Sequence, residues 1–384
     1  MMTNRELFKN YVKNGGEKFL CSPQIGAGAG FDTRLAGKTW ITSTTMDDTR
    51  AACRSFDMTP LYNMGLPDLT CLTPELNITG EMRVEKEGKR RVFTNTLHTG
   101  KGDLTSVTIE EELMGVCPVK AYIGVDEDDP ENEEKQLDIL DYYLDALLEV
   151  KDFSPIVNGV RGCRNYIGED DPLDIQWAMQ PYELLCFPSN KDTAIFASIY
   201  EDRFKKLMDK VLRLDEKLLP AVAAGGSDFV FLGGPGAEMI SPAYYEKFLV
   251  PYSKIVTDMA HKAGLLIYSH ICSPIEPMLT KGYYNQMGID LFETLSPAPV
   301  GNVKSIEDAF SKLSPDICTR GNIGLDSLLN DTPEVIYEKS MHILEMAKKM
   351  GRKHILAASD YLFYDTKIEN VEAMCRAVRD FNGN

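Results

Sequence analysis

The chain has 384 residues, a net charge of −17 and a hydrophobic content of 43%. Nucleic acids and anionic membranes bind basic surfaces, so this charge excludes both as expected partners. No run of eighteen apolar residues predicts a transmembrane helix, and the polar segment 1–19 lacks the apolar core of a signal peptide. The nine cysteines form no C-x-x-C pair, which is typical of a reducing compartment. We therefore expect a cytoplasmic protein.

Over the C-terminal two thirds of the chain, short apolar runs alternate with longer amphipathic runs, which predicts βα units and a parallel sheet. Two earlier segments, 18–22 and 56–61, complete a set of eight strands, which favours a (β/α)8 barrel. An open doubly wound sheet is the alternative, but no G-x-G-x-x-G follows a strand. The predicted later strands span 174–179, 228–232, 265–272, 290–295, 317–323 and 354–360, and the helices between and after them span 242–263, 277–287, 306–312, 325–350 and 368–381.

Residues 81–120 interrupt this rhythm with paired extended segments and polar turns. We expect them to form an inserted β-hairpin region that leaves the barrel and returns to it. An acidic stretch, 126–135, then leads into a predicted helix near 136–150. No linker long enough to separate two domains is present, so we expect one domain over residues 1–384.

In barrels of this kind the active site lies at the carboxyl ends of the strands. The glycine-rich stretch 233–236 follows a strand and either allows close backbone approach to a ligand or only turns the chain. Asn322 is either a ligand contact or the cap of the next turn. The polar residues that end or follow the predicted strands are Gln180, Glu238, His270, Cys272, Glu293, Asn322 and Asp360, with Asp57 a candidate from the second strand.

His270 and Cys272 carry the sharpest local signal. Residues i and i+2 of a strand point to the same side, so an H-x-C pair at a strand end aims an imidazole and a thiol into one cavity. Both groups are good zinc ligands, and the carboxylates of Asp360 and Glu293 are available as a third ligand. The alternative is a hydrogen-bonded barrel histidine beside a core thiol.

Several stretches of the chain together match the sequence patterns of one protein superfamily. The chain resembles the uroporphyrinogen decarboxylase superfamily, which includes corrinoid-dependent methyltransferases. The matching stretches are QPYELL (180–185), ISPAYYEKFLVPYSKIV (240–256), LIYSHICSPIEPML (266–279), GNIGLDSLL (321–329) and ILAASDYLFYDTKIENVEAM (355–374), with a weaker match at HTGKGDLT (98–105).

The resemblance implies a barrel and a zinc ion held by His270 and Cys272, which match the H-x-C pair of the methyltransferases. At the later ligand position those enzymes have cysteine and the decarboxylases usually have histidine, whereas this chain has Asp360. The ligand set is therefore nitrogen, sulfur and oxygen, which zinc accepts. We expect Asp360 to be the third ligand or the proton donor, and Glu293 to be a further ligand or the catalytic acid. The strand-end residues Gln180 and Asn322 are expected cofactor contacts.

On this basis we expect a methyltransferase that moves a methyl group from a small-molecule donor to a corrinoid carried by a partner protein. A site with fewer thiolates is harder and favours an oxygen donor, such as a methoxylated aromatic. The sequence leaves a homodimer open. Porphyrinogen decarboxylation is the first alternative, although the segment 21–34 lacks the arginine pair with which decarboxylases bind the acidic substrate. A non-catalytic barrel that binds a corrinoid or tetrapyrrole is the second.

Overall fold

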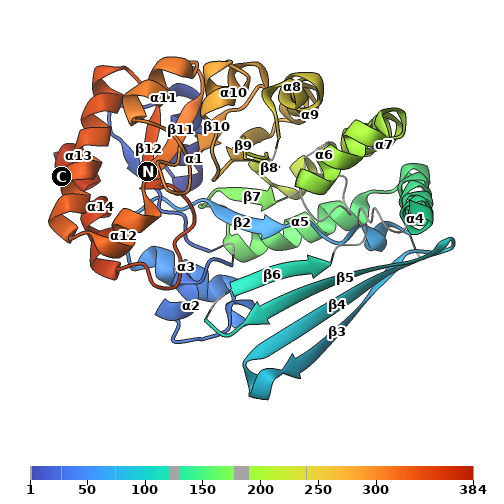
Figure 1. Cartoon of the computed structure of the whole chain (residues 1–384). Coiled ribbons are helices and arrows are strands. Elements are labelled where there is room, and N and C mark those ends of the chain that lie inside the picture. Colours follow the sequence, from blue (N-terminus) through green and yellow to red (C-terminus); the bar gives the residue numbers. More distant parts are fainter. Residues whose placement is uncertain are drawn as a thin grey trace.

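A computed structural model gives a parallel eight-stranded sheet that curls into a barrel (Figure 1), as the sequence predicts. It describes residues 2–383 except 27, 74, 114, 121–129, 177–189 and 239. The sheet order is β1-β12-β11-β10-β9-β8-β7-β2. A hydrogen bond of 2.8 Å from the Thr59 amide to the Cys21 carbonyl joins β1 to the segment that enters β2. The strands are β1 (Leu20–Cys21), β2 (Tyr62–Gly65), β7 (Leu173–Gln176), β8 (Phe229–Gly233), β9 (Leu266–His270), β10 (Leu291–Glu293), β11 (Cys318–Ile323) and β12 (His354–Ala358).

These strands form because their apolar side chains can be buried on both faces, between the barrel interior and the surrounding helices. β8, β9 and β12 consist almost wholly of buried residues. The helices are α1 (Asn4–Asn14), α2 (Phe31–Leu35), α3 (Met46–Arg54), α4 (Pro130–Glu149), α5 (Ser154–Ile167), α6 (Asn190–Ile199), α7 (Glu201–Gly225), α8 (Pro242–Tyr244), α9 (Val250–Lys262), α10 (Glu276–Thr280), α11 (Ile306–Lys312), α12 (Leu325–Asn330), α13 (Pro333–Lys349) and α14 (Ile368–Phe381). Within the described residues, no helix is long and apolar enough to cross a lipid bilayer.

The predicted second strand, 56–61, is wrong, because the strand is β2, which begins directly after that segment. Pro60 has no amide proton to give to a strand ladder, so pairing starts beyond it. Asn63 and Gly65 are typical turn residues and hid the true strand. Asp57 therefore lies before β2 and not at its carboxyl end, where it is an exposed partner of Arg379 at 3.5 Å.

Two predicted helices are divided in the structure. Residues 325–350 form α12 and α13, because Thr332 caps a new helix whose first residue is Pro333. Proline is favoured at a first helical position and disrupts a helix interior. Residues 277–287 give only α10 and a short 3-10 turn, Tyr284–Gln286, since Gly282 between them has a φ of 69°.

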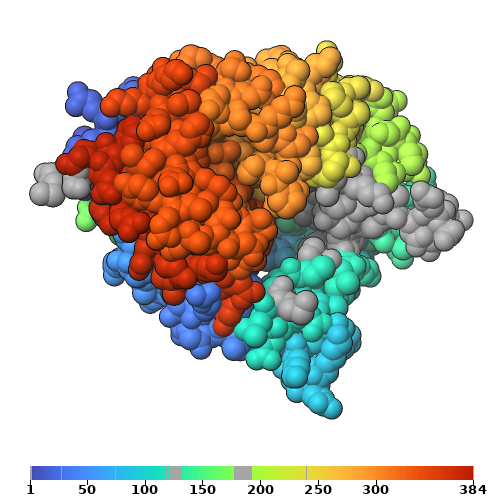
Figure 2. Space-filling model, turned by 60° about the vertical axis from the view of Figure 1, so that its left-hand side comes forward, coloured from blue at the N-terminus to red at the C-terminus, as the bar shows by residue number. Residues whose placement is uncertain are grey.

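The expected excursion is a four-stranded antiparallel sheet, β3 (Asn77–Glu85), β4 (Arg90–Thr99), β5 (Gly102–Glu111) and β6 (Gly115–Lys120). It lies in the long connection that follows β2, so it is attached to the carboxyl end of the barrel. Figures 1 and 2 show this sheet projecting from the body of the molecule. Part of the acidic stretch 126–135 falls outside the described residues, and the helix predicted after it is α4.

The opposite end of the barrel is covered by α1. Phe8 packs edge-on against Phe229 with ring centroids 5.8 Å apart. The fully buried carboxylate of Asp228 accepts hydrogen bonds from Arg5 at 2.9 Å, Lys9 at 2.7 Å and Arg164 at 2.6 Å. This cluster holds α1 and α5 onto the start of β8.

We expect Asp228→Ala to lower the free energy of unfolding by about 3 to 5 kcal/mol, because it leaves the buried Arg164 guanidinium without its anion. Urea denaturation followed by circular dichroism measures the change. The matched control is Glu169→Ala, since Glu169 also binds Arg5 but is 73% exposed. That control should change the stability by less than about 1 kcal/mol. Equal effects of the two substitutions would contradict the structural role of Asp228.

Candidate metal centre

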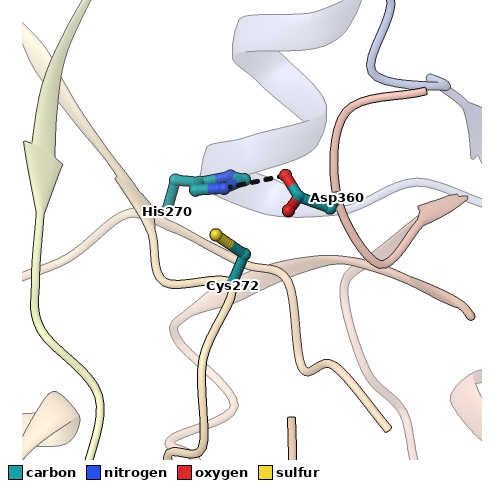
Figure 3. A group of neighbouring side chains, drawn as sticks. All are labelled: His270, Cys272 and Asp360. Atoms are coloured by element: carbon teal, nitrogen blue, oxygen red, sulfur yellow. Dashed lines mark ion pairs between the residues drawn. The ribbon is translucent and has the colours of Figure 1, made fainter. Parts of the chain in front are cut away.

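His270, Cys272 and Asp360 converge at the carboxyl end of the barrel. Their ligand atoms all lie within 4.8 Å of one another. The His270 Nε2 is 3.2 Å from Asp360 Oδ1, and the sulfur of Cys272 points toward the same space (Figure 3). The sequence named these three residues as candidate metal ligands, and the structure brings them together.

Backbone pairing explains this convergence. His270 is the last residue of β9 and lies opposite Gly233 of β8 and Glu293 of β10. The Ile271 amide donates to the Glu293 carbonyl at 2.9 Å, so the chain follows β10 one residue beyond the strand and keeps Cys272 beside the barrel mouth. Asp360 follows β12, and its carboxylate accepts a hydrogen bond of 2.7 Å from the Tyr361 amide.

Glu293 holds the His270 ring from the opposite side. Its carboxylate is completely buried, and Oε1 lies 2.6 Å from His270 Nδ1. The Tyr268 hydroxyl donates to the same oxygen, and Arg320 forms an ion pair of 3.2 Å with Oε2. Burial alone would raise the pKa of Glu293, but the charge of Arg320 and the hydrogen bond to His270 hold it below its ordinary value. Glu293 is therefore an anion that fixes the histidine ring.

The neighbouring groups also change the pKa of His270. Burial alone would lower the pKa of its imidazole, but hydrogen bonds with Asp360, Cys272 and Glu293 hold that pKa well above its ordinary value. An imidazole so surrounded by anionic groups attracts a proton or another cation.

A polar wall continues from this group across the barrel interior. The Gln176 amide donates to the Tyr361 hydroxyl at 3.3 Å, and that hydroxyl donates to Asn63 Oδ1 at 3.2 Å. The Asn63 amide in turn donates to Asp174 at 2.8 Å. Burial raises the pKa of Asp174 to about 7 and the pKa of Tyr361 to about 12. Tyr361 is therefore a neutral hydrogen-bonding group near neutral pH.

Sequence reasoning missed this wall and the Glu293 partners. Arg320 and Asp174 lie inside predicted strands, where a charged residue in a barrel must be either paired or functional. That signal was present in the sequence. Nothing local marked Tyr268 or Asn63, since their partners are distant in the chain.

The remaining candidates have different positions. The Asn322 amide donates to the Leu295 carbonyl at 2.9 Å. Asn322 also borders a cavity of about 560 Å³, whose lining includes Ser305, Glu307 and His342 but none of the three converging residues. Gln180 lies outside the described residues. In the 233–236 loop, a side chain on Gly236 would clash with Glu238 and Ser273, so this glycine permits close packing of two loops.

The three converging residues fit a divalent metal. They offer one imidazole nitrogen, one sulfur and one carboxylate oxygen, which are donor types that zinc accepts. The second ring nitrogen of His270 is held by a buried carboxylate, which is the usual outer partner of a metal-binding histidine. Three protein ligands leave a coordination position for a substrate, as in catalytic rather than structural zinc sites.

Residues 188–381 match the family model described as uroporphyrinogen decarboxylase (URO-D). The chain belongs to the uroporphyrinogen decarboxylase family. This confirms the resemblance seen in the motifs, and the three converging residues all lie within the matched segment.

Two known proteins extend this comparison. A uroporphyrinogen decarboxylase from Synechococcus sp. (strain CC9605) is 26% identical over 248 residues, which cover 61% of this chain and 66% of that protein. The solved structure of a methyltransferase from Methanosarcina mazei shares the fold, with a TM-score of 0.65 and 15% identity over 99% of both chains. The first match is a distant sequence relative, and the second shows that the chain shares its fold with a solved structure.

We expect Glu293→Gln to lower the pKa of His270 by at least about one unit, because it removes the anion that favours the imidazolium. The imidazolium of the metal-free variant would then lose its proton at lower pH, which an NMR titration of the histidine rings can follow. The matched control is Asp290→Asn. Asp290 raises the pKa of His261 in the same way, so this substitution should lower that pKa and leave His270 unchanged. An unchanged His270 pKa in Glu293→Gln would show that Glu293 does not control this ring.

Proposed function

We propose that this chain is a metal- and corrinoid-dependent methyltransferase that takes a methyl group from an oxygen donor. The observation that carries the proposal is the convergence of His270, Cys272 and Asp360 at the open end of a barrel of this family. These three residues would hold a divalent metal, most simply zinc. The methyl acceptor is the Co(I) form of a corrinoid on a separate protein, and it acts as a second substrate.

In this reaction the methyl–oxygen bond of the donor breaks and a methyl–cobalt bond forms. The electron pair of the first bond stays on the oxygen, which takes up a proton. A divalent metal supplies a Lewis acid for that oxygen. Glu293 keeps the His270 ring in place, and Asp360 is either a ligand or the proton donor. The Tyr361 ring lies beside the His270 ring, and its hydroxyl and the Gln176 amide that donates to it can orient the donor.

An aryl methyl ether is the favoured donor. Its cleavage leaves a phenoxide, which is a better leaving group than the methoxide that methanol would leave. The carboxylate of Asp360, in place of a thiolate, makes the ligand set harder, and harder metal centres prefer oxygen to sulfur. Both arguments favour a methoxylated aromatic over a methyl thiol.

The corrinoid protein would dock at the barrel mouth. The β3–β6 sheet is attached to this end of the barrel and projects beside it (Figure 1). Gln180 and Asn322 remain proposed corrinoid contacts. A cytoplasmic location and a homodimer also remain proposals.

Decarboxylation is the second candidate, favoured by the name of the Synechococcus relative. A porphyrinogen carries several carboxylates, and the strand ends that the structure describes offer them no unpaired lysine or arginine. Arg320 is the single arginine of the barrel strands, and it is buried against Glu293. A barrel that binds a tetrapyrrole without turnover is the third candidate, and it needs no metal.

We expect the purified protein to contain about one divalent metal per chain. Cys272→Ala should remove that metal and leave the circular dichroism spectrum unchanged, because one residue at the barrel mouth contributes little to the core. The matched control is Cys117→Ser, an exposed cysteine of β6, which should keep the metal. Elemental analysis of proteins purified without chelator decides the question. Full metal content in Cys272→Ala would refute the assignment.

We expect at least one methoxylated aromatic to methylate cob(I)alamin. The change in the cobalt absorption spectrum measures this reaction. Asp360→Asn should lower kcat/KM at least about tenfold, because it weakens an anionic ligand or removes a proton donor. Asp360→Cys should keep the metal and favour methyl thiols. Asp365→Asn, at an exposed position nearby, is the control and should behave as the parent. Methylation by thiols but by no ether would refute the oxygen-donor assignment.

A further inference from the structure

The barrel strands carry few charged side chains, and most of these are acidic. The eight strands and the two residues after each contain three carboxylates, Asp174, Glu293 and Asp360. Arg320 is the single lysine or arginine at these same positions. The strands and the residues directly after them therefore contribute more carboxylates than lysine or arginine side chains.

Arg320 is not available to a substrate. Its side chain is 2% exposed, and its Nε donates to the Ser22 carbonyl at 2.9 Å. Its Nη1 forms the ion pair with Glu293. Two arginines of the connections after β1 and β2 are also engaged. Arg34 donates to the carbonyls of residues 364 and 366 at 3.0 Å, and Arg91 stacks on Trp40 at 4.0 Å from the ring centroid.

The metal-loaded site has no excess positive charge. A divalent ion is balanced by the Cys272 thiolate and the Asp360 carboxylate, and the neutral imidazole of His270 adds nothing. Glu293 and Arg320 balance each other. Asp174 is either neutral or negative. The described barrel strands and the residues directly after them offer an anionic substrate no unpaired lysine or arginine, and they place carboxylates close to it, which is strongly unfavourable in a partly dehydrated cavity.

We propose that the methyl donor is uncharged and that the site rejects carboxylated or sulfonated donors. This inference rests on the proposed methyl transfer and names the substrate class for it. The walls fit such a donor. The rings of Tyr361 and Phe231 lie 5.4 Å and 6.5 Å from the His270 ring, and the Gln176 amide offers a neutral hydrogen-bonding group. An aromatic ring with methoxy and hydroxyl substituents matches these surfaces without a formal charge.

Two donors that differ by one carboxylate test the proposal, namely 2-methoxyphenol and 4-hydroxy-3-methoxybenzoate. With the zinc-loaded full chain and cob(I)alamin, the uncharged donor should have a kcat/KM at least about tenfold higher. Calorimetric binding of the demethylated products, catechol and 3,4-dihydroxybenzoate, gives a readout without turnover. Catechol should bind at least about tenfold more tightly.

A positive charge introduced at the mouth should weaken this selectivity. Gln176→Lys supplies a cation on a flexible side chain at the end of β7, so it should increase the relative use and binding of the carboxylated compounds. Gln176→Met is the matched uncharged control, and it should leave the ratio between the two donors as in the parent. A Gln176→Met variant that shifted the ratio equally would contradict the electrostatic explanation.

The outcomes separate this inference from the proposed function. Methyl transfer from both donors at equal kcat/KM, with equal binding of both phenols, would overturn the charge selectivity and leave the methyltransferase proposal intact. Selective binding of catechol without any methyl transfer would support the charge selectivity and contradict the proposed function. Binding of neither phenol and no transfer would overturn both.

Discussion

The buried carboxylate of Glu293 is the group on which the rest of the site depends. A carboxylate removed from water is strongly destabilising unless charged or hydrogen-bonding partners surround it. Here the partners come from the two strands that flank β10: Tyr268 and His270 from β9, and Arg320 from β11. Only the parallel register of these strands brings them together. The same contacts turn the free nitrogen of His270 toward Asp360. Satisfaction of one buried charge therefore also shapes the candidate metal centre.

The residues at one end of the barrel mainly stabilise the fold, and those at the other end form the candidate site, as is general for this fold. At the amino end of the strands, α1 and the Asp228 cluster consist of paired charges and aromatic packing. At the carboxyl end, the polar groups of the mouth are linked through Tyr361, and the insertion after β2 forms a projecting sheet. Substitutions at the first end affect folding, whereas those at the second end affect ligands.

Membership of the uroporphyrinogen decarboxylase family does not identify the reaction, because one fold supports many reactions. The reaction has to be inferred from the residues of the site. A polycarboxylate substrate needs cations that can pair with it, whereas Arg320, the single arginine of the described barrel strands, is paired with Glu293. A metal with mixed ligands and no excess charge suits the cleavage of a neutral ether.

The sequence by itself determined the barrel, the insertion and the three converging residues. Strand alternation has a period of two, so His270 and Cys272 could be placed on one side of a strand end, and Asp360 ended another strand. Only the tertiary structure decided the partners of Glu293, because Arg320 is 27 residues away in the chain and Ser22, which binds Arg320, is 298 residues away from it. It also corrected the second strand, whose turn-like residues are stabilised by pairing with β7. Local patterns define elements and their faces, whereas the pairing of buried charges depends on strand register, which no local pattern contains.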